Sequence, residues 1–568
     1  MFARIKRVGF YAYLQLVRTE RQAGRPRQRV LATLGRVESL QSSGELDGLL
    51  RRLSQYSPRA LALIWGQTEP AARTWKLGPV LVFERLWQRL GLREILEGLL
   101  ANRQFGFAVE RTVFVTVLHR LCVSGSDRQA ERWREGYWLP GTEGLALHHW
   151  YRAMGWLGQG LPARPPNVPT PFGPRCVKDQ IEEALFSRRR DLFSSLSVAF
   201  FDTTSLYFEG QGGQSLGRRG KSKDHRPDLR QMGVGVVLDQ SGQPVCSHLW
   251  PGNTTDVKSL VPVAKDLQQR FGVERICVVA DRGMISAQTI AQLEAMGWEY
   301  ILGARMRSQS EVRDEVVGKL TAVPQGFAVV HPEREQAKDP SPLAVKEVWV
   351  GAHRYVVCYN AEQARKDAHD RAGIVAGLRQ ALRAGDKRLV GNQGYRRYLK
   401  NAGHHFEIDE AKREQEARYD GVWVLRTNTA LTTATVALRY KELWRVERLF
   451  RDTKSLVRTR PIYHKLDETI RGHVFCSFLA LVVLRELDRC LEQAGVAVEW
   501  NDGLRDLKAL QRMELQEGDK RMWVRSQVQG CCAQVFKAVG LALPPVLQLA
   551  DAPSQNRAEG DDDRRDPM

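Results

Sequence analysis

Metal-binding cysteine motifs are missing from this sequence. The chain of 568 residues has nine cysteines, and none forms a Cys-x-x-Cys pair or a zinc-type spacing with a histidine. This pattern excludes a zinc-finger module and gives no support to a disulfide framework. An odd, scattered set in a chain of this size predicts reduced and mostly buried thiols, as in a cytosolic protein.

Long hydrophobic runs are missing as well. The longest, from Val474 to Leu484, is about half as long as a membrane span and lies between Arg471 and Arg485. We therefore expect a buried helix there and no membrane-spanning segment. The apolar stretch 10–13 is flanked by charge and is too short for the core of a signal peptide, which favours a cytoplasmic location.

Positive charge is what the chain has in excess. The formal net charge is +20, which indicates a polyanionic partner rather than a particular fold. The excess is concentrated at the amino terminus, where residues 1–36 hold nine basic side chains and a single acidic one, Glu20. Nucleic acid is the partner we expect, with an anionic membrane surface as the alternative.

The length of the chain exceeds what one hydrophobic core organises, so we expect several domains. Composition and patterning predict a basic β-hairpin (1–40), a helical DNA-binding region (45–160), a proline-rich linker (161–190), two parts of an α/β core (191–303 and 431–495), a mainly β insertion domain between them (304–430), a C-terminal helical region (496–550) and a disordered acidic tail (551–568).

The N-terminal segments suit DNA binding. Residues 9–34 alternate as the strands of a hairpin do, with a turn at 22–26, and such a basic ribbon fits a DNA groove or backbone. A solvated edge ribbon is the alternative. In the helical region, 112–122 is apolar enough for a core helix and Asp127 is placed to cap the next helix, but no helix-turn-helix spacing is present.

The central region has the element order of the ribonuclease H fold. In that fold the first and fourth strands are neighbours. The predicted elements are strands at 196–201, 232–238 and 245–250, a helix at 256–270, a strand at 275–280, a helix at 286–296 and a strand at 298–302.

Three carboxylates occupy the positions where this topology needs metal ligands. Asp202 and Asp281 each end a predicted strand, and Glu447 lies on a predicted helix at 436–455. Such a set can hold two Mg²⁺ ions about 4 Å apart, the arrangement that drives phosphodiester hydrolysis and transfer. Singly, each aspartate would be interpreted as a turn former, and Glu447 as part of a weak surface ion pair. Their joint agreement with the topology favours the metal site.

The glutamate helix is strongly basic. Tyr440, Leu443, Glu447 and Lys454 are spaced three, four and seven residues apart, which predicts that they share one helix face. Arg445 and Arg448 add charge that suits a helix lying along a DNA backbone. The basic loop 218–226 is expected beside the same site, either in contact with DNA or solvated.

These motifs resemble those of a known family. Phe201-Asp202-Thr203-Thr204, Asp281-Arg282-Gly283-Met284 and Tyr440-x2-Leu443-x3-Glu447-x6-Lys454 resemble bacterial insertion-sequence transposases of the DDE class, most closely the family-four group with the signature Tyr-x2-Arg-x3-Glu-x6-Lys. The resemblance spans about residues 195–490, including a β-rich insertion before the glutamate helix. Leu443 replaces the signature arginine, which leaves open whether a DNA hairpin forms during the reaction.

The resemblance implies a DNA transposase that cleaves the ends of an insertion sequence and joins their 3′-OH groups to target DNA. It implies a bacterial, nucleoid-associated homodimer that pairs two terminal inverted repeats. It also implies two Mg²⁺ ions, replaceable by Mn²⁺, on Asp202, Asp281 and Glu447. The residues expected to contact DNA are Tyr440, Lys454, Arg445, Arg448 and Arg282.

Two alternatives stay open from the sequence. One is a ribonuclease-H-like nuclease that only hydrolyses DNA, such as a junction resolvase, and it would never form joined products. The other is a DNA-binding descendant of a transposase that has lost catalysis, which the complete carboxylate set disfavours.

Overall fold

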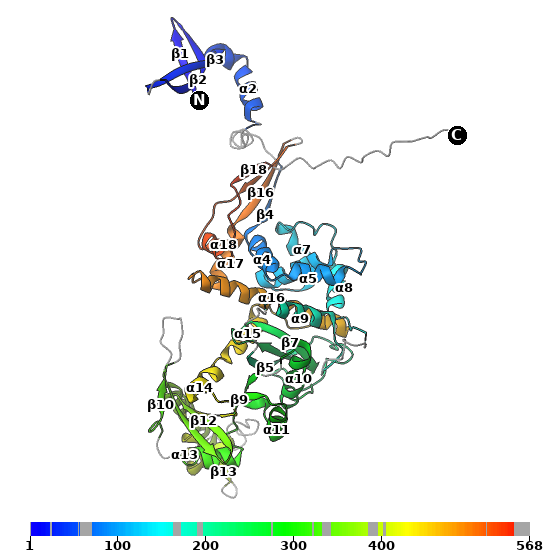
Figure 1. Cartoon of the computed structure of the whole chain (residues 1–568), viewed down its shortest axis with the longest axis vertical. Helices are drawn as coiled ribbons and strands as arrows, with labels where there is room; N and C mark the ends of the chain where they lie inside the picture. The colour runs from blue at the N-terminus through cyan, green and yellow to red at the C-terminus, as the bar shows by residue number, and fades with distance from the viewer. Residues whose placement is uncertain are drawn as a thin grey trace, which may run out of the picture. The chain divides into compact units, whose positions relative to one another are not determined.

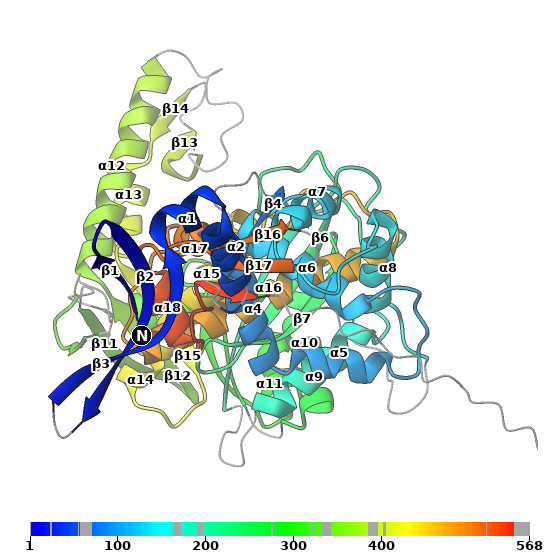
Figure 2. The same cartoon turned by 90° about the horizontal axis from the view of Figure 1, so that it is seen from above.

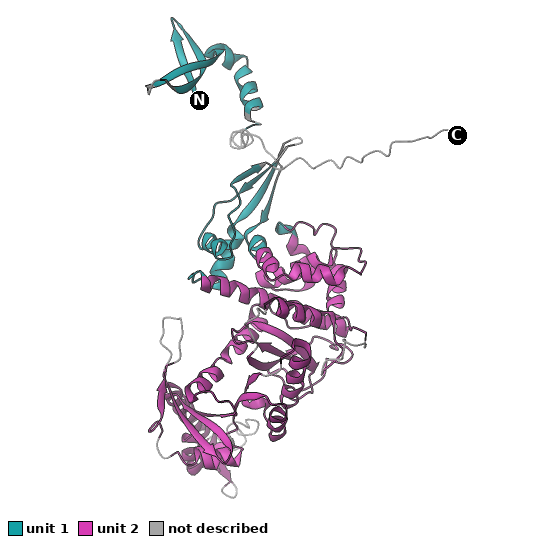
Figure 3. Ribbon diagram, viewed as in Figure 1, with its two compact units in different colours: residues 1–82, 135–138, 494–568 teal, residues 83–134, 139–493 magenta. Residues whose placement is uncertain are grey.

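The computed structural model describes two compact units, coloured separately in Figure 3. One lies within residues 1–82, 135–138 and 494–568, and the other within 83–134 and 139–493. The tail predicted to be disordered lies outside the described residues. Those are residues 2–22, 25–54, 56, 71–162, 172–189, 197–273, 276–320, 323–331, 342–383, 396–401, 405–517 and 520–549.

The first unit begins with a small antiparallel sheet in the order β1-β2-β3 (Figure 1). The strands are β1 (Phe2–Val8), β2 (Tyr11–Gln22) and β3 (Arg25–Arg36), so the expected hairpin is present and gains a third strand. Two helices follow, α1 (Val37–Ser42) and α2 (Glu45–Ser54).

A second sheet of this unit joins distant parts of the chain in the order β18-β17-β16-β4. Its elements are β4 (Ala71–Lys76), β16 (Gln511–Glu517), β17 (Lys520–Arg525) and β18 (Leu547–Leu549), with helices α17 (Trp500–Ala509) and α18 (Cys532–Ala538). The prediction of a helical region at 496–550 was therefore wrong for three of its five described elements, which are strands. Met522 is fully buried, and Leu515 and Leu547 of the neighbouring strands pack against it.

The second unit contains a helical layer. It consists of the end of α4 (Gly78–Arg89), then α5 (Leu92–Leu100), α6 (Val109–Cys122), α7 (Asp127–Trp133), the short η1 (Arg134–Gly136) at the unit boundary, α8 (Leu147–Leu157), α9 (Val177–Arg189) and the long α16 (Asp467–Gln493). The core helices expected around 112–122 and 474–484 are α6 and α16, and both are buried. None of the helices among the described residues has the length and apolarity to cross a membrane.

Two local predictions in this layer were wrong. The linker expected at 161–190 contains α9, because Lys178, Asp179 and Glu182 enter a buried ion network instead of facing solvent. The cap of α7 is Ser126, whose hydroxyl accepts from the Gln129 N–H, and Asp127 is the first helical residue. All nine cysteines are free thiols and eight of them are buried, as expected.

The centre of the second unit is a nine-stranded sheet in the order β10-β11-β12-β15-β9-β8-β5-β6-β7. The predicted core elements are β5 (Val198–Tyr207), β6 (Gln231–Leu238), β7 (Pro244–Pro251), the turn η2 (Asp256–Lys258), α10 (Leu260–Phe271), β8 (Cys277–Ala280), the turn η3 (Arg282–Met284), α11 (Ala287–Ala295) and β9 (Glu299–Gly303). β5 pairs with β8 in parallel, so the predicted neighbour relation is confirmed.

The insertion, expected as a mainly β domain, continues this sheet. Leu425 of β15 pairs with Gly303 of β9, so the edge strand of the core gains a partner for its backbone groups. The insertion comprises η4 (Glu311–Val317), β10 (Ala328–Val330), β11 (Leu343–Val350), β12 (His353–Tyr359), α12 (Ala361–Arg383), η6 (Arg396–Tyr398), β13 (Leu399–Asn401), β14 (Phe406–Ile408), α13 (Glu410–Ala417) and β15 (Val422–Thr427). In Figure 2, α12 lies beside the β13–β14 hairpin.

The expected continuous helix at 436–455 is two helices, α14 (Thr433–Lys441) and α15 (Trp444–Ser455). The break at Glu442 and Leu443 lets α14 pack on β9 and β11 while α15 packs on β5 and β6. Because a sheet twists, one straight helix cannot follow both parts of it. Tyr440 and Glu447 therefore lie on different helices, so the prediction of one shared face was wrong for Tyr440, whereas Glu447 and Lys454 both lie on α15.

Candidate active site

Asp202 and Asp281 lie side by side on neighbouring strands. In the parallel register of β5 and β8, Phe201 pairs with Ala280, and each is followed directly by one of the two aspartates. The expectation that both aspartates end a strand holds only for Asp281. β5 continues to Tyr207 because β6 pairs with it over the whole of that extension, so Asp202 lies inside a strand.

Glu447 lies on α15 and approaches Asp202 from that helix. It lies in the first turn of that helix, which packs on β5. Burial raises the pKa of Asp202 to about 6. The Thr203 N–H and Lys223 oppose this shift, while the carboxylates of Asp281 and Glu447 add to it. Asp281 and Glu447 therefore both lie within electrostatic reach of Asp202.

The donor set fits a hard divalent cation. It consists of carboxylate oxygens, the ligands that Mg²⁺ and Mn²⁺ prefer, without a thiolate or imidazole. Mutual repulsion contributes to the raised pKa of Asp202, and a bound cation would relieve that repulsion. The protein contact of the Asp202 carboxylate is a 2.7 Å bond from the Thr203 N–H to Oδ1.

Tyr440 is the direct partner of Asp281. Its hydroxyl donates to Asp281 Oδ1 at 3.0 Å, and burial, reinforced by Asp281, raises the pKa of the phenol. Gly303, the last residue of β9, makes this contact possible. A Cβ at that position would lie 2.4 Å from the Tyr440 hydroxyl oxygen and 3.2 Å from the Arg282 amide nitrogen. The sequence pattern assigned Tyr440 to DNA and gave no signal for Gly303.

The predicted DNA-contacting arginines of α15 make protein contacts in this structure. Arg445 Nη1 donates to the Gln240 carbonyl at 3.0 Å, in the turn between β6 and β7. Arg448 Nη2 lies 3.7 Å from Asp488 Oδ2 on α16, and nearly half of the Arg448 side chain is exposed. Both contacts hold α15 against its neighbours, so a role in DNA binding remains a prediction for each.

Lys454 and Arg282 differ in their surroundings. Lys454 Nζ lies 2.8 Å from Asp224 Oδ1, and its side chain is mostly buried. Arg282 is exposed directly beside Asp281, where its carbonyl accepts from Arg305 Nε at 3.2 Å. Arg282 is therefore an exposed cation directly next to one of the three carboxylates.

Sequence analysis missed the specific part played by Lys223. Its Nζ donates to both the carbonyl and the hydroxyl oxygen of Thr203 at 2.7 Å and lies 3.2 Å from Asp256 Oδ2. Its positive charge also lowers the pKa of Asp202 and so opposes the effect of burial. The only signal in the sequence was its place in the basic loop 218–226.

A second cluster has the residue types of a metal site but is already in contact with a cationic side chain of the protein. Ligand atoms of Asp127, His464 and His473 lie within 4.8 Å of one another. However, Arg120 Nη2 lies 2.9 Å from His473 Nδ1, so a guanidinium already occupies the position of a cation. We interpret this cluster as a polar network that joins α6 and α7 to α16.

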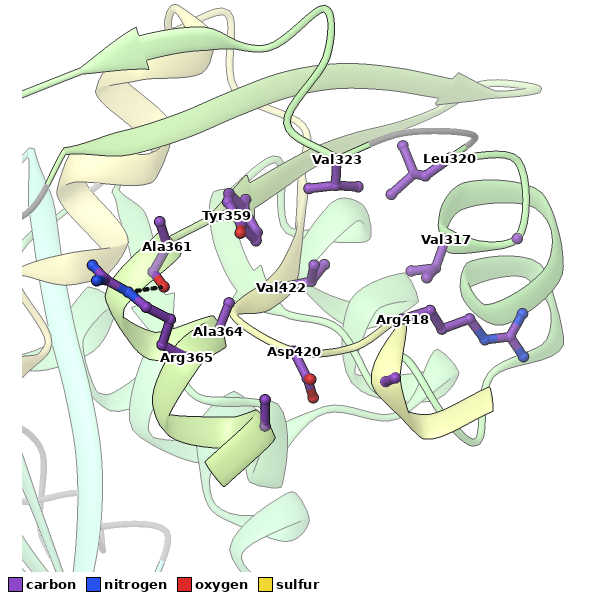
Figure 4. A pocket seen from close by; sticks show the side chains of 13 residues that line it. Val317, Leu320, Val323, Tyr359, Ala361, Ala364, Arg365, Arg418, Asp420 and Val422 are labelled. Carbon is purple, nitrogen blue, oxygen red and sulfur yellow. Dashed lines mark hydrogen bonds between the residues drawn. The ribbon is translucent and has the colours of Figure 1, made fainter. Parts of the chain in front are cut away.

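The insertion contains a cavity of about 700 Å³ beside α12 (Figure 4). Apolar side chains such as Val317 and Val422 line it together with the charged Arg365, Arg418 and Asp420. None of the sequence-predicted site residues lines it. The three carboxylates therefore do not belong to this cavity.

Comparison with protein families identifies the chain. Residues 194–483 match the model described as transposase DDE domain, and residues 3–69 match the one described as IS1634 family transposase, N-terminal domain. Since the first match spans half of the sequence, the chain belongs to the DDE transposase family. It is a bacterial insertion-sequence DNA transposase, an enzyme that cleaves DNA and transfers its strands.

Solved structures with some similarity are transposase–DNA complexes. A piggyBac transposase synaptic complex with hairpin DNA is 11% identical, with 76% of this chain and 79% of that chain covered and a TM-score of 0.37. A Mos1 transposase paired-end complex with the left transposon end is 14% identical, with 35% and 61% covered and a TM-score of 0.14. No curated protein sequence matches the chain.

Proposed function

We propose that this transposase cuts the terminal inverted repeats of an insertion sequence at a site formed by Asp202, Asp281 and Glu447. It then joins the freed 3′-OH ends to target DNA. The observation that supports this proposal most strongly is the parallel register of β5 and β8, in which the two aspartates follow paired residues. The influence of Glu447 on the pKa of Asp202 adds the third carboxylate.

The three carboxylates would hold two Mg²⁺ ions, with Mn²⁺ as a substitute. Bound cations supply the activation of a water or 3′-OH nucleophile and the stabilisation of the leaving oxygen. Side chains of the protein hold the carboxylates in place. Tyr440 orients Asp281 through its hydroxyl, and Lys223 fixes β5 next to Asp202 by binding Thr203.

The positively charged residues near the site and in the first sheet are the proposed DNA contacts. Arg282, Arg445, Arg448, Lys454 and Tyr440 are proposed to contact the DNA near the cleaved end. The basic β1–β3 sheet is proposed to bind the inverted repeat, and two copies of the chain to pair two ends. Because phosphate contacts release counterions, binding should weaken steeply with salt. We also propose the family-four signature group and action at the bacterial nucleoid.

The test is an excision and integration assay that uses the DNA flanking the gene as donor ends. We expect joined products from the wild-type protein in Mg²⁺ and none from Glu447→Gln, with end binding retained in both. Cleavage without any joined product would identify a hydrolytic nuclease instead. Binding without cleavage by the wild type would identify a DNA-binding protein that has lost catalysis.

A further inference from the structure

We infer that Asp224 is a positioning residue that sets the place of Glu447 relative to Asp202. This inference rests on the proposed active site, because it concerns the geometry of the same carboxylates. Asp224 belongs to the loop between β5 and β6, and it touches neither of those acidic residues itself. It acts through the elements that carry them.

The first observation is that Asp224 forms ion pairs with residues at and just beyond the end of α15. Asp224 Oδ1 lies 2.8 Å from Lys454 Nζ, and Oδ2 lies 3.1 Å from Arg460 Nε. The carboxylate is 8% exposed, so solvent screens these pairs little. Lys454 follows Glu447 by seven residues, or about two helical turns, on the same helix. Fixing Lys454 therefore limits how α15 can rotate or slide at Glu447.

The second observation is that Lys223, the residue before Asp224, binds the strand that carries Asp202. Lys223 donates from Nζ to the carbonyl and hydroxyl of Thr203, and its backbone N–H donates to Ser205 Oγ at 2.8 Å. Thr203 is the neighbour of Asp202 in β5. Two consecutive loop residues thus connect the strand that carries Asp202 to the helix that carries Glu447.

The loop itself is anchored to the segment that follows α15. Phe208 forms a parallel bridge with Ile462, and Glu209 donates its N–H to the Ile462 carbonyl at 3.0 Å. Further along the loop, the hydroxyl of Ser215 donates to Asp467 Oδ2 at 2.6 Å. The position of Asp224 is therefore set by several contacts, and the ion pairs transmit that position to α15.

Charge explains why Asp224 matters. One buried carboxylate separates two cations, Lys454 and Arg460. Without its charge the two cations face each other with no counterion, and the last turn of α15 must shift to separate them. A shift there moves Glu447 while the DNA-contacting surface stays basic. The expected defect is in cleavage and in the use of metal ions, not in DNA binding.

The experiment compares Asp224→Asn with the wild type on a duplex of the gene's own inverted repeat. Measured are end binding, the cleavage rate at saturating DNA, and the Mg²⁺ and Mn²⁺ concentrations that give half of that rate. Changes in the residues that orient metal ligands typically cost 10- to 100-fold, and we expect cleavage to fall by about that factor. End binding should stay within about twofold, and the metal requirement should rise.

Asp228→Asn is the matched control. It removes the same charge from the same loop, where Asp228 forms an exposed pair with Arg226, and it should leave all three readouts unchanged. Asp224→Glu keeps the charge and moves it by one methylene, so it should recover part of the cleavage rate. This variant also keeps the inference testable if Asp224→Asn does not fold, since a wild-type rate and metal requirement in Asp224→Glu would then contradict it.

A double-mutant cycle tests the pathway through Lys454. If Asp224 acts through the ion pair, Asp224→Asn combined with Lys454→Met should cleave no more slowly than the worse single variant. Wild-type cleavage by Asp224→Asn, losses that multiply in the double variant, or a loss confined to end binding would each overturn the inference. Failure of the wild type to cleave would instead refute the proposed function, which keeps the two failures distinct.

Discussion

The hydroxyl of Tyr440 donates a 3.0 Å hydrogen bond to Asp281, across 159 residues of sequence. It connects α14 to the end of β8 and fixes the orientation of one carboxylate of the proposed metal site. Because burial raises the pKa of the phenol, Tyr440 stays protonated and remains a donor at neutral pH. The bond uses one oxygen of Asp281 and leaves the other for a cation.

We predict that Tyr440→Phe cleaves DNA ends about tenfold more slowly and needs more Mg²⁺, because Asp281 loses the group that orients it. End binding, measured by a mobility shift, should change little. Tyr463→Phe is the control, since Tyr463 is 66% exposed. A loss of binding as large as the loss of cleavage would show that the Tyr440 hydroxyl acts on DNA and not by orienting Asp281.

Gly303→Ala should impair cleavage by displacing the same tyrosine. The added Cβ would lie 2.4 Å from the Tyr440 hydroxyl oxygen, closer than any tolerated contact. We expect at least a tenfold loss, measured as the rate at saturating end DNA, and Gly303→Ala with Tyr440→Phe should be no worse than Gly303→Ala alone. Gly377→Ala, with open space around it, is the control. A fully active Gly303→Ala would show that this packing is unimportant.

Arg270→Met should destabilise the second unit by about 3–5 kcal/mol, because it leaves buried carboxylates without a counterion. Arg270 Nη2 lies 2.8 Å from Glu182 Oε2 and Nη1 lies 3.0 Å from Asp266 Oδ2, and only 6% of its side chain is exposed. Denaturant unfolding measures the change. Arg313→Met, which removes an exposed pair, should change the stability much less. Equal losses of stability in the two variants would show that the buried ion pairs of Arg270 contribute no more than an exposed pair.

The basic β1–β3 sheet should govern the salt dependence of end binding. Arg18 and Arg29 are cross-strand partners on the exposed sheet, so neutralising both with glutamine should not destabilise it. If each contacts a phosphate, the slope of log Kobs against log salt should become less negative by about 1.8. Lys319→Gln, an exposed change on the insertion, is the control. An unchanged slope would exclude these two residues from the interface.

Much of the core followed from the sequence because its signals are local. The apolar runs that form β5 and β8 and the intervening helix pattern gave the strand order, and the neighbour relation of Asp202 and Asp281 followed from it. The predictions were wrong where contacts with distant elements of the same chain decide the local structure. β5 extends past Asp202 because β6 pairs with it, and the helix breaks at Leu443 because two parts of a twisted sheet have to be covered.

The sequence by itself determined the class of protein, the strand order of the core and the three candidate carboxylates, because periodicity and motif spacing are written along the chain. Only the tertiary structure decided that the insertion extends the core sheet, that Tyr440 bonds Asp281 and that Asp224 holds Lys454. These contacts join residues more than one hundred positions apart. They depend on strand register and on the burial of charge, which no local pattern encodes.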